Sequence, residues 1–426
     1  MAKTISKGKG TRREDCCSFC GHSRNEVTII FQGLDGANIC NECIEHGYKN
    51  INDFGLTQTA QVAKKSNPSN ISLEGTPKPR EIKEFLDKYI IGQDEAKRSI
   101  AVAVYNHYKR LSAEGKKSDV ELDKSNIVLV GPTGTGKTLI ARTIARLLNV
   151  PFTIVDATVL TQAGYVGEDV ESILSRLYQA ANYDAKAAER GIIFIDEIDK
   201  IARKGDNPSI TRDVAGEGVQ QALLKILEGT VVNVAPQGGR KHPEQQFVQI
   251  DTRNILFIAG GAFDGVERRI AERMNTRAMG YGRVDTESID RDNLMRYIQP
   301  QDLRAFGLSP ELVGRMPVLT YLEPLSREAL RSILTEPKNA IVSQYKALLA
   351  MDDVELEFSE ETLDYIVEKA VEYRLGARAL RTICEVIMKE VMFDAPSSSE
   401  KHITITRDYA ERCVNHLPLA SMQASA

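Results

Sequence analysis

The sequence contains a glycine-rich segment of the kind that binds the phosphates of a nucleotide. It reads Gly131-Pro-Thr-Gly-Thr-Gly-Lys137-Thr138 and follows the apolar run Ile127–Val130. Backbone N–H groups of such a loop, at the start of a helix, can cradle phosphates, while the lysine neutralises the β- and γ-phosphates and the threonine hydroxyl binds Mg²⁺. We therefore expect a nucleotide site formed by Gly131, Pro132, Thr133, Gly134, Thr135, Gly136, Lys137, Thr138 and Leu139.

Two adjacent carboxylates supply the second half of this chemistry. The apolar run Ile192–Ile195 ends in Asp196 and Glu197. We expect Asp196 to hold the Mg²⁺ shell and Glu197 to polarise an attacking water. A small-molecule kinase must shield its phosphate from water and has no use for a water-activating glutamate there. The pair therefore favours ATP hydrolysis.

The cysteines cluster near the N-terminus, where five of the seven lie within the first 43 residues. Cys17-x-x-Cys20 and Cys40-x-x-Cys43 form two pairs with the spacing of a four-thiolate Zn²⁺ site. Such a site has no open position for water, so its expected role is structural. Cys16 could replace Cys17, although the symmetric pairing favours Cys17, and His22 fits a surface position better than a ligand position.

A parallel sheet is needed to position these motifs. Apolar runs at Ile127–Val130, Phe152–Val155, Ile192–Ile195 and Ile255–Ile258 alternate with helical patterns, which is typical of an α/β domain. After about Leu322 helical spacing dominates, with a short β-like run at His402–Ile405. The predicted organisation is an N-terminal zinc-binding domain at 1–56, a flexible linker at 57–79, a large α/β domain at 80–322, a small mainly helical domain at 323–418 and a disordered tail at 419–426.

Charge and hydropathy narrow the class of protein. The 426 residues carry a formal net charge of −4, which argues against a protein that mainly coats nucleic acid. No apolar run approaches the roughly 18–20 residues of a membrane helix, and the basic N-terminus lacks the apolar core of a secretory signal. We expect a cytoplasmic protein without membrane or nucleic-acid partners.

Taken together, these motifs resemble the AAA+ superfamily and, within it, the ClpX family, from Cys17 to about Leu419. The resemblance implies an AAA+ P-loop NTPase domain in a homo-hexamer that unfolds proteins with ATP, Mg²⁺ and Zn²⁺ as cofactors. It implies that Ile90 and Ile91 pack on the adenine and that Arg315, in Gly-Arg-Met-Pro, is the arginine finger for a neighbouring subunit. Arg378, in Gly-Ala-Arg, looks like the second sensor. The polar first sensor cannot be assigned, because the run at 254–259 ends in two glycines.

The same resemblance assigns three loops to the handling of polypeptide. Tyr165 and Val166, between Gly164 and Gly167, match the loop that grips substrate in the central pore. Burial is the usual fate of Tyr-Val, but the flanking glycines and Glu168-Asp169 favour exposure here. The loop at the pore entrance is matched by Arg240, Lys241 and His242, and a second pore loop by residues 204–214, with Arg212 as its candidate.

The same resemblance implies the partners of the chain, although the sequence differs from the family in one loop. Met279, Gly280 and Tyr281 stand where family members that serve the ClpP peptidase carry Ile/Leu/Val-Gly-Phe. Methionine keeps the apolar character, whereas tyrosine adds a hydroxyl that must stay hydrated or find a partner. A ClpP-type peptidase remains the expected partner, with protein substrates and adaptors recruited by the zinc domain, which resembles a dimerising module.

Two other functions can be compared with the sequence. A nucleic-acid-directed AAA+ ATPase would use the zinc module to bind DNA or RNA, but residues 16–55 lack a basic, aromatic stripe. A small-molecule P-loop kinase would have no need of Glu197, the paired arginines or the pore-like loop.

Overall fold

The structure is a computed structural model, and it describes residues 16–24, 26–32, 37–46, 76–113, 120, 122–161, 168–203, 216–235, 247–277, 293–373, 376–397 and 401–415. The chain divides into two compact units, Met1–Asn70 and Ile71–Ala426. Within the described ranges, none of the helices combines the length and the apolar character that crossing a bilayer requires.

The N-terminal unit has a very small core. Strands β1 (Ile30–Gln32) and β2 (Asn38–Cys40) pair antiparallel, and residues 41–46 form a helical turn after β2. Its hydrophobic cluster consists of Cys17, Val27 and Cys40, with Ile30 and Cys43 packed against it. A core of this size supplies little stabilisation by itself, so such units usually depend on a bound metal or on disulfides.

The second unit contains a five-stranded parallel sheet, which confirms the predicted α/β class. Its strand order is β11-β3-β10-β7-β4. The strands are β3 (Ile127–Val130), β4 (Phe152–Asp156), β7 (Ile192–Asp196), β10 (Leu256–Gly261) and β11 (Val318–Tyr321). The edge strand β11 was not predicted. It pairs with β3, so the last strand of the domain in sequence lies beside the first.

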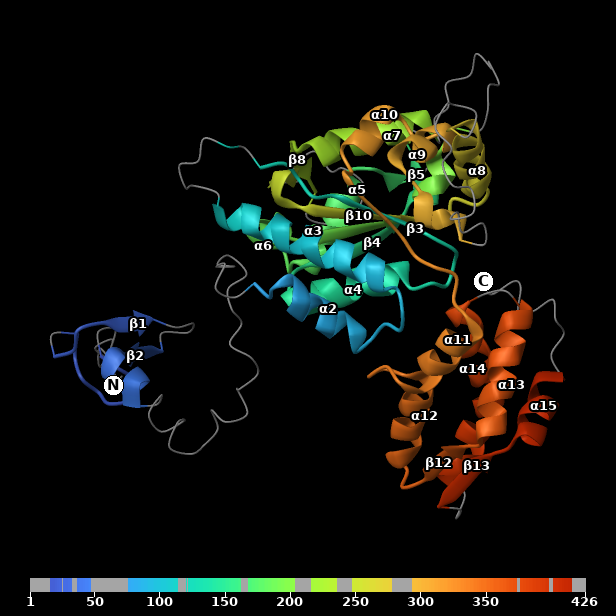
Figure 1. Ribbon diagram of the computed structural model, residues 1–426. Coiled ribbons are helices and arrows are strands. Elements are labelled where there is room, and N and C mark those ends of the chain that lie inside the picture. The colour runs from blue at the N-terminus through green and yellow to red at the C-terminus, as the bar shows by residue number, and fades with distance from the viewer. Residues whose placement is uncertain are drawn as a thin grey trace, which may run out of the picture. The chain divides into compact units, whose positions relative to one another are not determined.

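Helices cover both faces of this sheet. One face carries α2 (Pro79–Asp87), α3 (Asp94–Ala113) and α4 (Lys137–Leu148), and the other carries α5 (Ser172–Ala180), α7 (Glu217–Glu228), α8 (Val266–Arg277), α9 (Pro300–Phe306) and α10 (Pro310–Gly314) (Figure 1). Successive strand residues point to opposite faces. Ile192 and Phe194 therefore join the first core, while Ile193 and Ile195 join the second.

Shorter elements complete the large domain. They are β5 (Leu160–Thr161), β6 (Glu168–Asp169), α6 (Ala185–Ala188) and the antiparallel hairpin of β8 (Val231–Val234) with β9 (Val248–Asp251). The hairpin was also not predicted from the sequence, because its strands are short and half-exposed.

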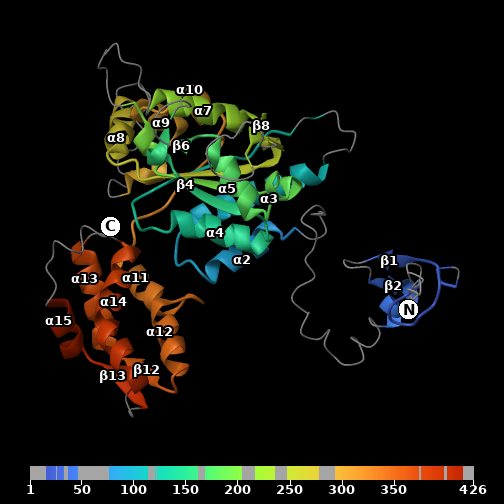
Figure 2. The same cartoon turned by 180° about the vertical axis from the view of Figure 1, so that it is seen from behind.

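The C-terminal part of the second unit is mainly helical, as predicted. Helices α11 (Arg327–Thr335), α12 (Ile341–Ala350), α13 (Glu360–Tyr373), α14 (Ala377–Asp394) and α15 (Arg407–Asn415) share one core with the parallel pair β12 (Glu355–Phe358) and β13 (His402–Ile405) (Figure 2). The predicted β-like run at 402–405 is β13, whereas its partner β12 was missed.

One buried amide connects three parts of the large domain, and it gives the first prediction. The Asn126 side chain is 1% exposed, accepts a hydrogen bond from the Phe257 N–H at 3.3 Å and donates one to the Arg315 carbonyl at 2.9 Å. Asn126→Ala leaves both backbone groups without their partner, so we expect the free energy of unfolding to fall by about 2–4 kcal/mol.

Urea denaturation followed by far-UV circular dichroism measures this change. The matched control is the exposed Asn415→Ala, for which we expect a change within about 0.5 kcal/mol. Equal stabilities of the two variants would show that Asn126 does not hold these segments together.

Candidate functional site

The glycine-rich loop lies at the carboxyl end of β3 and leads directly into α4. Its glycines take conformations that other residues rarely adopt, with φ of +81° at Gly134 and +100° at Gly136. A Cβ at Gly131 would stand 2.7 Å from the Leu322 carbonyl oxygen, so the chain after β11 packs directly on the loop. The loop therefore has the backbone geometry that directs N–H groups toward a phosphate.

Lys137 is placed at the first turn of α4. Its side chain is 8% exposed, and Nζ donates to the Gly131 carbonyl at 2.6 Å and the Pro132 carbonyl at 3.0 Å. Burial lowers the pKa of Lys137, while the charges of Asp196 and Asp199 oppose that change. A buried ammonium beside carboxylates, at a helix N-terminus, is suited to neutralising a polyphosphate.

The predicted carboxylates lie at the end of β7, which β10 separates from β3 in the sheet. The Thr138 hydroxyl donates to Asp196 Oδ2 at 3.0 Å, which brings together the two side chains expected to hold Mg²⁺. Hydroxyl and carboxylate oxygens are ligands that Mg²⁺ prefers. The donor set therefore fits Mg²⁺ with a nucleotide.

Glu197 leaves the strand in a left-handed conformation, with φ of +55°, and its N–H donates to Asp196 Oδ1 at 3.0 Å. The pKa of Glu197 is raised, mainly because the side chain is partly buried and secondly because the charge of Asp156, at the end of β4, is nearby. A carboxylate with a raised pKa is a better proton acceptor, which is the property a water-activating base needs.

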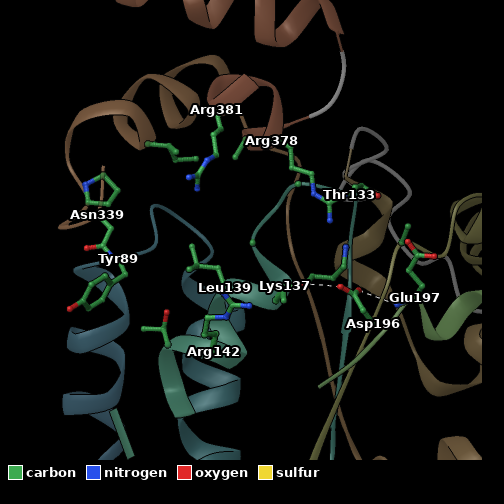
Figure 3. A pocket seen from close by; sticks show the side chains of 18 of the residues that line it. Tyr89, Thr133, Lys137, Leu139, Arg142, Asp196, Glu197, Asn339, Arg378 and Arg381 are labelled. Carbon is green, nitrogen blue, oxygen red and sulfur yellow. Dashed lines mark hydrogen bonds between the residues drawn. The ribbon is translucent and has the colours of Figure 1, made fainter. Parts of the chain in front are cut away.

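The nucleotide pocket has walls from both the large and the small domain. A cavity of about 760 Å³ is lined from the large domain by Lys137, Thr138, Asp196 and Glu197, and from α14 by Arg378 and Arg381 (Figure 3). The Ala377 N–H donates to the Gly134 carbonyl at 3.3 Å, so the start of α14 contacts the loop itself. Arg378 is thus brought to the site predicted for it.

Some predicted nucleotide residues lie just outside this lining. Gly131, Pro132 and Thr135 form the base of the loop, and Thr135 Oγ1 donates to the Pro132 carbonyl at 2.8 Å. Tyr89 lines the pocket in place of Ile90 and Ile91. Ile90 packs in the core beneath it and Ile91 is half-buried.

Several lining residues were missed by sequence reasoning. Arg142 and Arg146 lie four and eight residues after Thr138 on α4, a helical spacing that could have identified them. The Arg146 guanidinium lies 4.3 Å from the centroid of the Tyr89 ring. Asn339 and Gln344 come from the small domain, and no local pattern signals them.

Arg315 is not among the residues that line this pocket. It ends α10, and its Nη2 and Nε donate to Glu228 Oε1 at 2.9 and 3.2 Å. Both side chains are about half exposed. The guanidinium is therefore at the surface, away from the nucleotide site of its own chain.

The predicted substrate and docking loops lie outside the described residues. These are Tyr165, Val166, Arg212, Arg240, Lys241, His242, Met279, Gly280 and Tyr281. Their flanking elements are described: β5 and β6 on either side of 162–167, α7 after 204–215, and the β8–β9 hairpin around 236–246.

A separate metal centre lies in the N-terminal unit. The sulfurs of Cys17, Cys20, Cys40 and Cys43 all lie within 4.8 Å of one another, and the closest pairs are 3.6 and 3.9 Å apart. A tetrahedral site with Zn–S bonds of about 2.3 Å requires sulfurs about 3.8 Å apart, so the arrangement fits Zn²⁺.

Two other residues considered as ligands lie outside this cluster. The backbone of Cys16 pairs with that of Ser23 in an isolated antiparallel β-bridge. The His22 side chain is half-exposed beside Glu42.

Thiols this close cannot ionise independently. Hydrogen bonding among the thiols, chiefly with Cys20, raises the pKa of Cys43 to about 12, while the Cys20 backbone N–H lowers that of Cys17 to about 6. The backbone N–H groups of Cys40 and Cys43 also donate to sulfurs, at 3.3 and 3.4 Å. A divalent cation would resolve the repulsion among the thiolates.

Comparisons with known proteins agree with both sites. Family models match as "ClpX C4-type zinc finger" over residues 15–53, "AAA domain (Cdc48 subfamily)" over 122–319 and "C-terminal, D2-small domain, of ClpB protein" over 325–406. Relatives described as "ATP-dependent Clp protease ATP-binding subunit ClpX" are 60% identical in Bacteroides fragilis, 59% in Bacteroides thetaiotaomicron and 58% in Porphyromonas gingivalis. These alignments cover 94–96% of this chain and 97–98% of the relatives.

The zinc centre gives the second prediction. Cys40→Ser replaces a fully buried ligand by a hydroxyl that binds zinc poorly, so we expect the chain to retain less than about a tenth of the bound zinc. Elemental analysis after dialysis measures the zinc content. Cys413→Ser, in the small domain and outside the cluster, is the control and should keep the parent's zinc.

The environment of Glu197 gives a prediction about pH. Protonated Glu197 cannot accept a proton from water, so ATPase activity should fall as the pH drops through its raised pKa. Asp156→Asn removes a negative charge that contributes to the raised pKa and keeps the oxygen that accepts from the Thr158 N–H at 2.8 Å. We therefore expect the acidic limb of the pH–activity profile to move to lower pH.

Steady-state ATP hydrolysis across a pH series measures this shift. Asp352→Asn, an exposed change in the small domain, should leave the profile where it is. A limb that stays in place, or moves to higher pH, in Asp156→Asn would contradict the assigned electrostatics.

Proposed function

The chain belongs to the ClpX family of AAA+ ATPases, and on that premise we propose that it unfolds proteins with the energy of ATP hydrolysis and passes them to a ClpP-type peptidase. It is an ATPase with ATP, Mg²⁺ and Zn²⁺ as cofactors. The main support for the mechanical role is the nucleotide pocket, whose walls come from both the large and the small domain.

Four side chains of the large domain carry the proposed chemistry. Thr138 and Asp196 would hold Mg²⁺, which would supply positive charge to the phosphates, and Lys137 adds a second cation at the start of α4. Glu197, with its raised pKa, accepts a proton from the attacking water. Lys137 is buried and held in place before the reaction, so it lowers the barrier without reorganisation.

Movement follows from the arginine of the small domain. Arg378 lines the pocket from α14, so its contacts differ between nucleotide states. A ligand shifts a domain angle only by the difference in its contacts with the two arrangements. The angle between the domains is therefore the quantity that ATP binding and hydrolysis change, by a hinge motion.

The proposed working unit is a homo-hexameric ring. Arg315 lies at the surface and outside the pocket of its own chain, a position that suits an arginine finger acting on a neighbouring subunit. In such a ring Tyr165 and Val166 grip the polypeptide, helped by Arg212 and by the basic loop Arg240, Lys241 and His242. The roles of these loop residues rest on the sequence.

The remaining assignments also rest on the sequence. Met279, Gly280 and Tyr281 dock the peptidase, and the zinc domain recruits substrates or adaptors. We keep the domain boundaries at 56/57, 79/80, 322/323 and 418/419, and place the protein in the cytoplasm, where thiolates stay reduced for zinc. The match to the zinc finger of a Clp subunit favours this function over the nucleic-acid alternative.

ATP-dependent unfolding of a tagged fluorescent protein tests the proposed function. We expect the parent to abolish the fluorescence, Glu197→Gln to bind ATP but hydrolyse it at least about 100-fold more slowly, and Tyr165→Ala to hydrolyse ATP without unfolding. Tyr165→Phe keeps the apolar ring and serves as the matched control, with unfolding close to that of the parent.

Two outcomes would contradict the unfoldase role. One is a parent that hydrolyses ATP but leaves every tagged substrate folded. The other is a Tyr165→Ala variant that unfolds substrate as fast as the parent, which would remove the grip from this loop.

A further inference from the structure

The side chain of Gln93 joins two segments that are 230 residues apart. Its Nε2 donates to the Glu323 carbonyl at 2.8 Å, and the Glu323 N–H donates to its Oε1, also at 2.8 Å. The side-chain amide thus pairs with both polar groups of one residue, as a neighbouring strand would. Gln93 is 9% exposed, so water competes little for these hydrogen bonds.

The backbone at Gln93 has an unusual conformation. Its φ is +61°, in the left-handed region that residues other than glycine, asparagine and aspartate seldom enter. The Gln93 carbonyl accepts from the Lys97 N–H at 2.9 Å, in the first turn of α3. Strained residues of this kind persist where the surroundings fix them, and they cluster at functional positions.

One end of the contact is where the chain leaves the large domain. Glu323 follows β11, and the preceding Leu322 is fully buried with its N–H donating to the Val130 carbonyl at 2.7 Å. Residues 323–326 then lead into α11, the first helix of the small domain. The position and direction of Glu323 therefore set where any hinge between the domains begins.

The other end is the turn between α2 and α3, part of which lines the nucleotide pocket. Gln93 closes the turn that begins at Tyr89, which lines the pocket. Lys97 Nζ donates to the Ile90 carbonyl at 2.9 Å and fixes the middle of that turn. The small domain contacts the residue just before this turn, because the Lys338 N–H donates to the carbonyl of Lys88 at the end of α2, at 2.9 Å.

We propose that Gln93 is a positioning residue for the ATPase motor, which holds the start of the interdomain hinge at Glu323 fixed relative to the turn that lines the nucleotide pocket. The inference rests on the proposed function. With this contact in place, a change at the pocket must appear as rotation of the small domain. Without it, the strand end and the turn move separately, and ATP is hydrolysed with less mechanical output.

Gln93→Glu is the sharpest variant. It keeps the size of the side chain and the acceptor for the Glu323 N–H, but it puts a second acceptor against the Glu323 carbonyl. Gln93→Leu removes both hydrogen bonds. Gln179→Glu, the same substitution at an exposed position on α5, is the matched control.

The experiment measures kcat and KM for ATP, the ATP consumed per tagged fluorescent protein unfolded, and the thermal unfolding midpoint. For both Gln93 variants we expect kcat within about twofold of the parent. For Gln93→Glu we expect an increase of about three- to tenfold in KM and in ATP consumed per substrate, the scale of one lost hydrogen bond, and for Gln93→Leu, which loses both, an increase at least as large. Because protonated glutamate regains a donor, the deficit of Gln93→Glu relative to the parent should shrink at lower pH, while that of Gln93→Leu should not.

The outcomes separate the two ideas. A parent that unfolds substrate, with Gln93→Glu and Gln93→Leu matching it in KM and in ATP consumed, overturns the role of Gln93 alone. Proportional losses of kcat and unfolding, with a lowered thermal midpoint and no pH rescue, reduce Gln93 to a structural residue and also overturn it. A parent that hydrolyses ATP without unfolding overturns the proposed function, and the KM comparison still decides whether Gln93 positions the turn.

Discussion

The order of the strands in the sheet brings the Thr138 hydroxyl within hydrogen-bonding distance of the Asp196 carboxylate, and the nucleotide site is built around this pair. These residues follow β3 and β7, which are separated in the sheet by β10 alone. Parallel strands bring all their carboxyl ends to one edge, so the loop and the acidic pair meet without further adjustment. This arrangement buries the Lys137 ammonium, whose charge is unfavourable there by itself. The nearby carboxylates of Asp196 and Asp199 stabilise that charge.

A second constraint comes from dividing the pocket between two domains. Arg378 and Arg381 are held by the core of the small domain, whereas the loop is held by the sheet. Gly376 takes φ of +59°, and a Cβ there would lie 3.1 Å from the Thr133 carbonyl oxygen, so a larger residue would crowd the approach of α14 to the loop. A change at the phosphates therefore affects how the two domains are arranged, and a change in that arrangement affects the phosphate site.

Local patterns in the sequence predicted the parts of the site that are local in the chain. The loop, the acidic pair and the cysteine pairs are short motifs, and the buried runs at 127–130 and 192–195 are strands, as expected. Strand β11 was missed because its four residues form a strand by pairing with β3, which is far away in sequence. Tyr89 lines the pocket, while Ile90 packs in the core beneath it, and the family resemblance that pointed to Ile90 and Ile91 could not distinguish neighbouring residues of this turn. Asn339 and Gln344 join the site only through tertiary packing.

The span of the pocket along the chain, from Tyr89 to Arg381, has a consequence for biosynthesis. At ribosomal speeds of roughly 5–20 residues per second, Tyr321 at the end of the sheet is translated several seconds before α14. All five strands and the phosphate loop are therefore translated before the two arginines of α14 that complete the pocket. Nucleotide turnover can therefore be coupled to movement of the small domain only after α14 has been made.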